Sequence, residues 1–183
     1  MLYKCMKSWA RQNECISIGI LVKGVMTYGL IYDPVRDELF TAEKGHGAQL
    51  NQQRIRVSET TALKSALVTT GFPFKSRNAL SAQMKMIESL FMQVSGIRRM
   101  GSAALDLAYV AAGRVQGHWS YGLQPWDIAA GSLLVKEAGG LVFDFLGQAD
   151  YMNTGNIIAG NAPIATALHH AVSEHFKIED QVE

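Results

Sequence analysis

The sequence predicts a layered α/β fold of the α+β kind. This prediction rests on a change of residue pattern between the two halves of the chain. The first half consists of short β-rich runs separated by turn residues, which indicates an antiparallel sheet. The second half alternates between strand and helix patterns, which favours helices covering a sheet. Of the 183 residues, 48% are hydrophobic and 18% are charged, so we expect a globular chain with its own core.

Two β-rich runs open the predicted antiparallel sheet, at 15–22 and 25–32. They are joined by Lys23-Gly24, a two-residue link of the kind that closes a hairpin. Further short runs separated by turn residues extend this meander, at 38–43, 48–50, 54–57 and 66–71.

A helical period follows at 78–94, where apolar side chains recur at intervals of four, three, four and three residues. This spacing places them on one helical face. We predict that the face packs into the core, with its methionines as filler between neighbouring side chains. The residues of the face are Leu80, Met84, Ile87, Phe91 and Val94.

The remainder of the chain predicts alternating elements. We expect strands at 97–100, 114–119, 141–144 and 156–160, and helices at 102–112, at 125–138 and from Pro163 onward.

Composition excludes several classes of protein. Seventeen basic against sixteen acidic residues give a net charge of +1, which argues against a nucleic-acid binder driven by bulk charge. Arg98 and Arg99 alone do not make a nucleic-acid site. No run approaches the roughly 18 apolar residues of a membrane span, and residues 1–14 lack the apolar core of a signal peptide. The two cysteines, Cys5 and Cys15, are predicted free thiols, so we expect a cytoplasmic protein.

Two predicted helix starts could carry chemistry. Gly101-Ser102-Ala103 opens one helix, and the unpaired N–H groups there could hold a phosphate, although Gly-Ser is also an ordinary N-cap. Asp127 lies in the first turn of the other, where it could ligate Mg²⁺ or simply complement the helix dipole. Three small residues follow Asp127 and would let a neighbouring layer approach closely; they are Ala129, Ala130 and Gly131. His118, on the strand between the two helices, is expected to face solvent.

A family resemblance adds to this interpretation. The chain contains RRMGSAALDLAYVAAGRVQGHWSYGLQPWDIAAGSLLVKEAGG, preceded by IYDPVRDELFTAEKGHGAQLNQQRIRVS and TTGFPF and followed by NIIAGN. These segments resemble the C-terminal half of the inositol monophosphatase family, in its bacterial branch, from Ile16 to the last helix. The resemblance implies the C-terminal portion of an αβαβα sandwich. It divides the chain into an unmatched segment 1–14, a sheet remnant at 15–70 and a C-terminal α/β domain at 71–183.

Members of the family hydrolyse phosphate monoesters such as inositol 1-phosphate and use Mg²⁺. By resemblance, Asp127 matches a metal ligand, and Gly101, Ser102 and Ala103 match the segment that lines the inositol pocket. Ser120, seven residues before Asp127, occupies a position where the family usually has a glutamate that bonds an inositol hydroxyl. Serine is shorter and neutral, so the substrate preference stays open. Members commonly form homodimers, and some bacterial ones bind the transcription machinery.

The family's other metal ligands come from an N-terminal half that these 183 residues lack. Asp33-Pro34-Val35-Arg36 does not replace it, because Arg36 stands where a second aspartate is required. We therefore expect the chain alone to be inactive or nearly so, and one sheet face to be apolar and exposed. A late start, a truncation or a shifted reading frame would explain the beginning of the chain. The alternatives are a non-catalytic interaction protein and a gene remnant with marginal stability.

Overall fold

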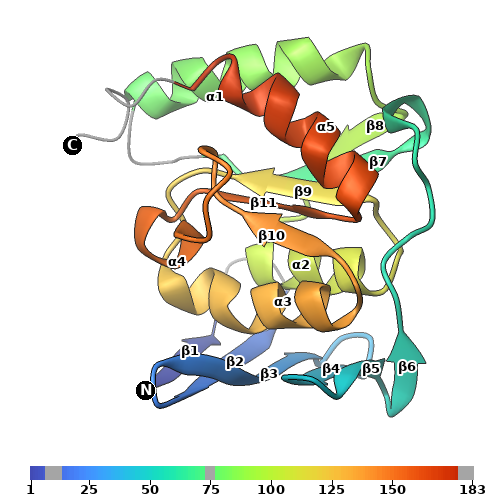
Figure 1. Ribbon diagram of the computed structural model, residues 1–183, viewed down its shortest axis with the longest axis vertical. Coiled ribbons are helices and arrows are strands. Elements are labelled where there is room, and N and C mark those ends of the chain that lie inside the picture. The colour runs from blue at the N-terminus through green and yellow to red at the C-terminus, as the bar shows by residue number, and fades with distance from the viewer. Residues whose placement is uncertain (7–13, 73–76, 177–183) are drawn as a thin grey trace.

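The computed structural model describes residues 1–6, 14–72 and 77–176 and arranges them in four layers (Figure 1). A six-stranded sheet forms one outer layer, and a pair of helices separates it from a five-stranded sheet. A second pair of helices covers the far face of the five-stranded sheet. The predicted layered α/β fold is confirmed.

The six-stranded sheet, sheet A, is an antiparallel meander in chain order. Its first hairpin turns at Lys23 and Gly24, whose φ angles of 51° and 80° confirm the predicted two-residue link. The sheet also includes a strand that precedes the predicted sheet segment. Its strands are β1 (Leu2–Met6), β2 (Ile16–Val22), β3 (Val25–Asp33), β4 (Glu38–Glu43), β5 (Gly47–Leu50) and β6 (Gln53–Ile55).

The five-stranded sheet, sheet B, has the order β10-β11-β9-β7-β8 and mixed strand directions. β7 pairs in parallel with β9 and β8, whereas β11 pairs antiparallel with both of its neighbours. The run predicted at 66–71 therefore forms a strand, but that strand belongs to sheet B. The strands are β7 (Leu67–Thr70), β8 (Gly96–Arg98), β9 (Gly117–Ser120), β10 (Leu141–Phe143) and β11 (Ile157–Gly160).

The helices lie close to their predicted positions, and two short ones were not predicted. The main helices are α1 (Arg77–Phe91), α2 (Ala103–Ala111), α3 (Pro125–Glu137) and α5 (Ala162–Ser173); the short ones are η1 (Leu63–Ser65) and α4 (Tyr151–Thr154). Helices α2 and α3 separate the sheets, and α1 and α5 cover sheet B. No described helix is both long and apolar enough to cross a membrane.

Small side chains bring α3 into close contact with sheet A. A Cβ atom added to Gly19 in β2 would lie 2.8 Å from the Cβ of Ala129, so only a hydrogen fits there. Gly29 in β3 is equally close to Ala130. The predicted close approach of a neighbouring layer is confirmed.

The face of α1 predicted to pack into the core is wrong for three of its five residues. Leu80, Met84 and Phe91 are 43%, 51% and 67% exposed, whereas Ile87 and Val94 are partly buried against the core. A neighbouring face packs on sheet B instead, and it consists of Ala82, Gln83, Met86 and Leu90.

Gln83 explains why apolar periodicity selected the wrong face. It is buried, and its Nε2 donates to Oγ1 of Thr70 at 2.7 Å and to the carbonyl oxygen of Gly71 at 3.0 Å. A pattern of hydrophobic residues assigns glutamine to the surface, but these hydrogen bonds compensate its burial.

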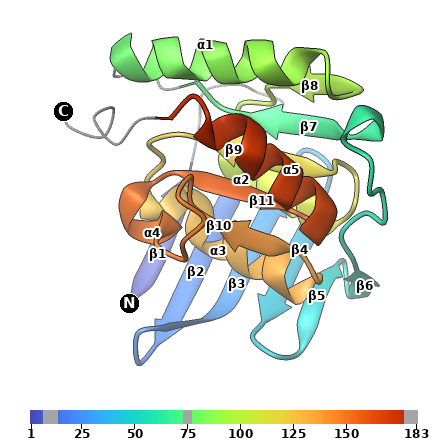
Figure 2. The same cartoon turned by 45° about the horizontal axis from the view of Figure 1, so that its top comes forward.

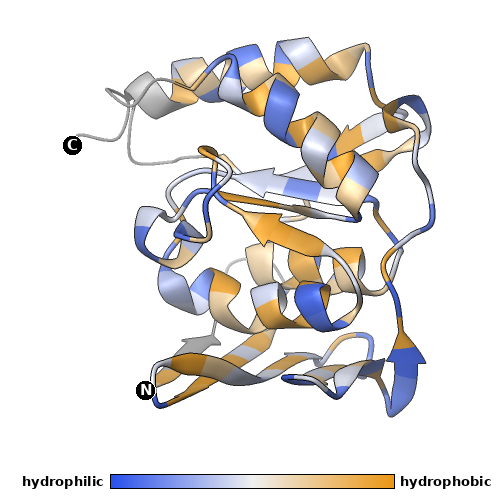
Figure 3. Ribbon diagram, viewed as in Figure 1, coloured by the Kyte–Doolittle hydropathy of each residue, from blue (hydrophilic) through white to orange (hydrophobic). Residues whose placement is uncertain are grey.

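The outward face of sheet A carries many apolar side chains, and no other described element covers it (Figure 1). Figure 3 shows hydrophobic residues in β2 and β3 of this sheet. Five of its large side chains are between 36% and 46% exposed; they are Ile20, Val22, Val25, Tyr28 and Leu39. A hollow of about 530 Å³ lies on this face and is lined by Ile18, Ile20, Tyr28, Leu30 and Thr41, among others. Within the described residues, this sheet has the exposed apolar face that the sequence predicts.

Candidate functional site

Helices α2 and α3 point their N-termini toward the same end of the molecule. Their C-terminal ends both contact the segment after β6: the amide of Val57 donates to the carbonyl of Ala138, and Gly113 packs against the backbone of Arg56. The two N-termini therefore lie together at the opposite end (Figure 1). Backbone N–H groups at a helix N-terminus favour an anion, and here two such N-termini lie at one place.

The start of α2 is tightly held. Gly101 has a φ angle of +96°, which a residue with a side chain rarely adopts. Ser102 is buried at the N-cap, where its Oγ accepts a long hydrogen bond of 3.5 Å from the amide of Leu105. The Sγ of Cys15, just before β2, lies 3.3 Å from the same Oγ. The ordinary N-cap role expected for Ser102 is thus present, and sheet A contributes to the site through Cys15.

The start of α3 places Asp127 in its first turn. Asp127 is 7% exposed, and its Oδ2 accepts from the amide of Gln124 at 3.2 Å. Pro125 occupies the first helical position, where the missing N–H costs nothing. Asp127 is therefore a capping residue whose carboxylate lies at the shared end of α2 and α3. The metal-ligand role stays a prediction.

Ser120 ends β9, just before the loop that leads to α3. It is buried, and its Oγ accepts from the amide of Gly71 at 3.0 Å. The hydroxyl keeps its own proton for a further acceptor. The loop is also fixed from its other side, because the amide of Gly122 donates to Asn156 Oδ1.

His118 does not face solvent, which corrects the sequence-based expectation. It is completely buried, with Nδ1 2.8 Å from Oγ1 of Thr69 and 3.9 Å from a carboxylate oxygen of Asp106 on α2. Burial lowers the pKa of His118 from 6.5 to about 3, so the imidazole is neutral at pH 7. The contact with Asp106 is therefore polar rather than an ion pair. Buried polar partners, invisible to hydropathy, explain the inward orientation.

The Asp33-Pro34-Val35-Arg36 segment forms a closed turn. Asp33 is buried, and its Oδ1 accepts from the amides of Val35 at 2.9 Å and Arg36 at 3.1 Å. Its Oδ2 accepts from the Arg36 guanidinium at 2.8 Å. The carboxylate is thus used by the turn, consistent with the sequence argument that this segment supplies no metal ligand.

The described residues do not by themselves fit a Mg²⁺ centre. Mg²⁺ takes an octahedral set of oxygens in which carboxylates supply the charge. At the helix N-termini the chain offers the Asp127 carboxylate and the Ser102 hydroxyl. Within residues 1–6, 14–72 and 77–176, no three His, Cys, Asp or Glu side chains are grouped so that they could hold a metal ion.

Comparison with known proteins places the chain in a family. The model of the Inositol monophosphatase family matches residues 7–177, nearly the whole sequence. This chain belongs to the inositol monophosphatase family. The matched range includes residues 7–14, which belong to the segment 1–14 for which the sequence analysis found no counterpart in the family.

Its relatives include Nus factor SuhB of Salmonella typhimurium, which is 52% identical over 153 residues, covering 84% of this chain and 57% of the relative. Nus factor SuhB of Pseudomonas aeruginosa is 48% identical over 162 residues, covering 87% of this chain and 60% of the relative. The chain therefore spans less than two thirds of the length of these relatives.

Solved structures of the family are similar too. The extragenic suppressor protein suhB from Bartonella henselae has a TM-score of 0.87 at 44% identity, covering 90% of this chain and 63% of that chain. The inositol monophosphatase from Anabaena has a TM-score of 0.83 at 40% identity, covering 92% and 68%.

Sequence reasoning found both helix starts but missed the contact of Cys15 with Ser102 at the start of α2. Cys15 is a buried free thiol, which confirms the prediction for this cysteine. The side chain of Cys5 lies outside the described part of the chain. The contact between Cys15 and Ser102 joins residues 87 positions apart, so no local pattern reveals it. The available signal was the position of Cys15 immediately before a strand.

Proposed function

We propose that this chain forms one wall of an inositol-monophosphatase-type site for a small phosphate monoester. In this proposal, Asp127 is one Mg²⁺ ligand, and Gly101, Ser102 and Ala103 line the substrate pocket. Mg²⁺, when bound in such hydrolases, polarises the phosphate and lowers the pKa of a water molecule. Inositol 1-phosphate is the model substrate. The natural substrate stays open, because Ser120 stands where the family usually has a glutamate.

One observation carries the proposal. The N-termini of α2 and α3 converge on one end of the molecule, and Asp127, which is 7% exposed, lies in the first turn of α3 there. Backbone N–H groups at two helix N-termini suit a phosphate, and a nearby carboxylate suits the cation that accompanies it. Membership of the family supports the same pairing.

We further propose that the 183-residue polypeptide alone does not hydrolyse phosphate monoesters, because Asp127 supplies a single carboxylate. Purified protein should release no more phosphate from inositol 1-phosphate with Mg²⁺ than a protein-free blank does. Asp127→Asn should give the same result, with circular dichroism confirming that both proteins are folded. Turnover that Asp127→Asn abolishes would show that the polypeptide is an enzyme on its own.

Binding can be measured apart from catalysis. Inositol 1-phosphate added to ¹⁵N-labelled protein should shift the amide signals of Gly101, Ser102 and Ala103 in the NMR spectrum. The amide of Gly45, in the hairpin between β4 and β5, should stay unchanged. Shifts at Gly45 alone, or none, would contradict the proposed pocket.

The relatives named Nus factor favour a second function, that of an interaction protein of the transcription machinery. Purified bacterial RNA polymerase, with and without added Nus proteins, can be tested for binding to the immobilised chain. The Asp127→Asn variant serves here as a control, because this function does not use the metal site. Absence of binding in every combination would remove this candidate.

A further inference from the structure

Three parallel strands of sheet B end beside the candidate pocket. β9, β7 and β8 are neighbours that run in the same direction, so their carboxyl ends share one edge of the sheet, and Figure 2 shows them next to one another. The chain leaves this carboxyl edge at Gly71, Arg99 and Tyr121, and α2 and α3 begin a few residues after the ends of β8 and β9. Ligands of α/β sheets bind outside such carboxyl ends.

Ser120, at the end of β9, is arranged to donate a hydrogen bond. It is 1% exposed, and its Oγ accepts from the amide of Gly71 at 3.0 Å. Because this amide occupies an acceptor position of the hydroxyl, the proton of Ser120 is directed to another group. An ionised glutamate, the usual residue here in the family, only accepts hydrogen bonds and therefore suits a substrate hydroxyl. Ser120 reverses this polarity and suits an anionic oxygen.

The strand end that orients Ser120 is fixed from α1. Nε2 of Gln83 donates to the carbonyl oxygen of Gly71 at 3.0 Å and to Oγ1 of Thr70 at 2.7 Å. Gln83 and Thr70 are each 1% exposed. Gly71 is thus bonded on both sides, through its amide to Ser120 and through its carbonyl to Gln83. This buried network holds the Ser120 hydroxyl in place before a ligand arrives, which lowers the entropic cost of binding.

The formal charge at the carboxyl edge also favours an anion. The strand ends and helix starts there are residues 70–72, 98–103 and 120–127. They contain two arginines, Arg98 and Arg99, and one acidic residue, Asp127, so their formal charge is +1. A glutamate at position 120 would cancel this charge. The serine therefore leaves the edge with a net positive charge that can attract a negatively charged group.

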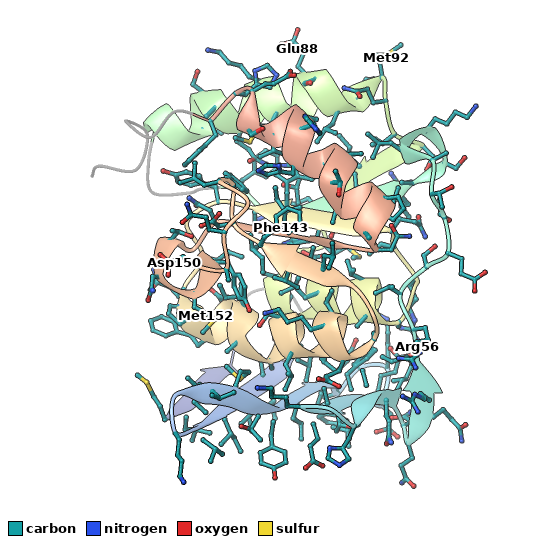
Figure 4. All side chains as sticks on the ribbon, viewed as in Figure 1. Arg56, Glu88, Met92, Phe143, Asp150 and Met152 are labelled. Carbon is teal, nitrogen blue, oxygen red and sulfur yellow. The ribbon has the colours of Figure 1, made fainter. Side chains whose placement is uncertain are left out.

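Acidic side chains of the neighbouring helices do not offset this charge. Asp106, one turn inside α2, is 2% exposed, and one of its carboxylate oxygens lies 3.9 Å from Nδ1 of His118. Figure 4 shows Glu88, the acidic residue of α1, pointing away from the body of the protein. Neither carboxylate is exposed at the carboxyl edge.

The two arginines at the end of β8 have different surroundings. Arg98 turns back on its own strand, where its Nη1 donates to the carbonyl oxygen of Ile97 at 3.1 Å. The guanidinium of exposed Arg99 instead lies over the ring of Phe72, 5.9 Å from its centroid. Phe72 directly follows Gly71, so this cation–π contact holds Arg99 beside the strand end that bonds Ser120. A guanidinium suits phosphate because its N–H groups bind two oxygens at once.

We propose that Ser120 and Arg99 bind a second phosphate group, so that the ligand of this site is a sugar or polyol bisphosphate. This inference rests on the proposed phosphatase-type pocket, in which the helix N-termini hold the first phosphate. The second phosphate then lies at the carboxyl edge, where Ser120 donates a hydrogen bond and Arg99 supplies the positive charge.

Isothermal titration calorimetry of the 183-residue chain tests the proposal. Inositol 1-phosphate is compared with inositol bisphosphates that differ in the position of the second phosphate, at one fixed ionic strength. The wild type should bind at least one bisphosphate about tenfold more tightly than the monophosphate, as expected for a charge-assisted hydrogen bond. The ratio of the two dissociation constants is the informative quantity, because a variant with a damaged fold loses affinity for both ligands.

Two substitutions should change this ratio in different ways. Arg99→Gln should bring the two dissociation constants close to equality, whereas Arg98→Gln, the matched control, should leave the ratio unchanged. Ser120→Glu should invert the preference, because a carboxylate repels the second phosphate and accepts from a hydroxyl of the monophosphate. Thermal unfolding of each variant shows whether the fold is retained.

The possible failures are distinguishable. Equal affinity of the wild type for inositol 1-phosphate and every bisphosphate would overturn this inference and leave the proposed function standing. A preference that Arg98→Gln reduces as much as Arg99→Gln would overturn it too, since bulk charge would then be the cause. Absence of binding for all inositol phosphates would overturn the proposed pocket together with this inference.

Discussion

A Cβ atom on Gly29 of β3 would lie 2.9 Å from the carbonyl oxygen of Ala130 in α3. The backbones of β3 and α3 are thus too close at Gly29 for any side chain to fit between them, and this contact holds α3 against sheet A. Asp127 lies in the first turn of the same helix, so the packing of Gly29 also determines where the candidate site lies.

Gly29→Ala should therefore destabilise the protein by about 1–3 kcal/mol, since the added methyl meets backbone that cannot turn away. Urea unfolding measures the change. Gln49→Ala, an exposed change in β5 of the same sheet, should alter stability by much less. An unchanged midpoint for Gly29→Ala would mean that α3 can move away from the sheet at little cost.

Gly131 lies where α3 packs against helix α2. Its added Cβ would lie 2.6 Å from the Cβ of Leu107 on α2. Alanine favours a helix by about 1 kcal/mol over glycine, so two effects oppose each other. We expect overpacking to win and Gly131→Ala to destabilise.

A double-mutant cycle separates the two effects. In the background of Leu107→Gly, which removes the Cβ of residue 107 together with the rest of the side chain, Gly131→Ala should become stabilising. The coupling energy should lie within about 0.5–3 kcal/mol. Additive effects would show that Leu107 is not the obstacle.

Local patterns predict much of this fold because many of its elements are defined locally. The Lys23–Gly24 hairpin and the alternation of strands and helices after residue 96 depend on turn residues and periodicity. Pairing between distant strands is different. β7 joins sheet B through β9, about 50 residues later in the chain, and nothing in its own sequence specifies that partner.

Two other errors in the prediction share a physical cause, which is the burial of polar side chains. Gln83 and His118 are both inside the protein because partners from other elements, Thr70 and Thr69, bond to them. For the candidate site, helix-capping signals located Ser102 and Asp127 correctly at helix starts. The contact between Ser102 and Cys15 depends on tertiary packing, which a capping signal does not contain.

Ser102 offers a direct test of the helix start. Ser102→Ala should cost about 0.5–2 kcal/mol, because the amide of Leu105 loses its acceptor, while Ser102→Gly should cost only a few tenths. Thermal denaturation compares the two variants. Equal losses would indicate that the contact with Cys15, rather than the cap, is what the hydroxyl contributes.

The outward face of sheet A should bind the apolar dye ANS in the folded state, since exposed apolar patches of this kind do so. Val22→Thr together with Val25→Thr keeps strand-forming side chains and removes apolar surface, so dye fluorescence should fall without loss of stability. Phe91→Glu controls for dye bound at the exposed apolar side chains of α1. Fluorescence that depends only on Phe91 would contradict this prediction.

The buried imidazole of His118 predicts how stability depends on pH. Its pKa is lowered by burial to about 3, whereas in the unfolded chain it returns to 6.5. Between these two pKa values the imidazole is protonated in the unfolded state but not in the folded state. The free energy of unfolding therefore falls as the pH drops from 6.5 toward 3. His118→Gln removes this term, and the stability that the wild type loses between pH 7 and pH 5 should exceed the variant's loss by about 1–2 kcal/mol. Urea unfolding at the two pH values measures it, with the exposed His46→Gln as control. Identical pH profiles for wild type and His118→Gln would mean that the imidazole is hydrated in solution, and that the core between sheet B and α2 is more open than the structure shows.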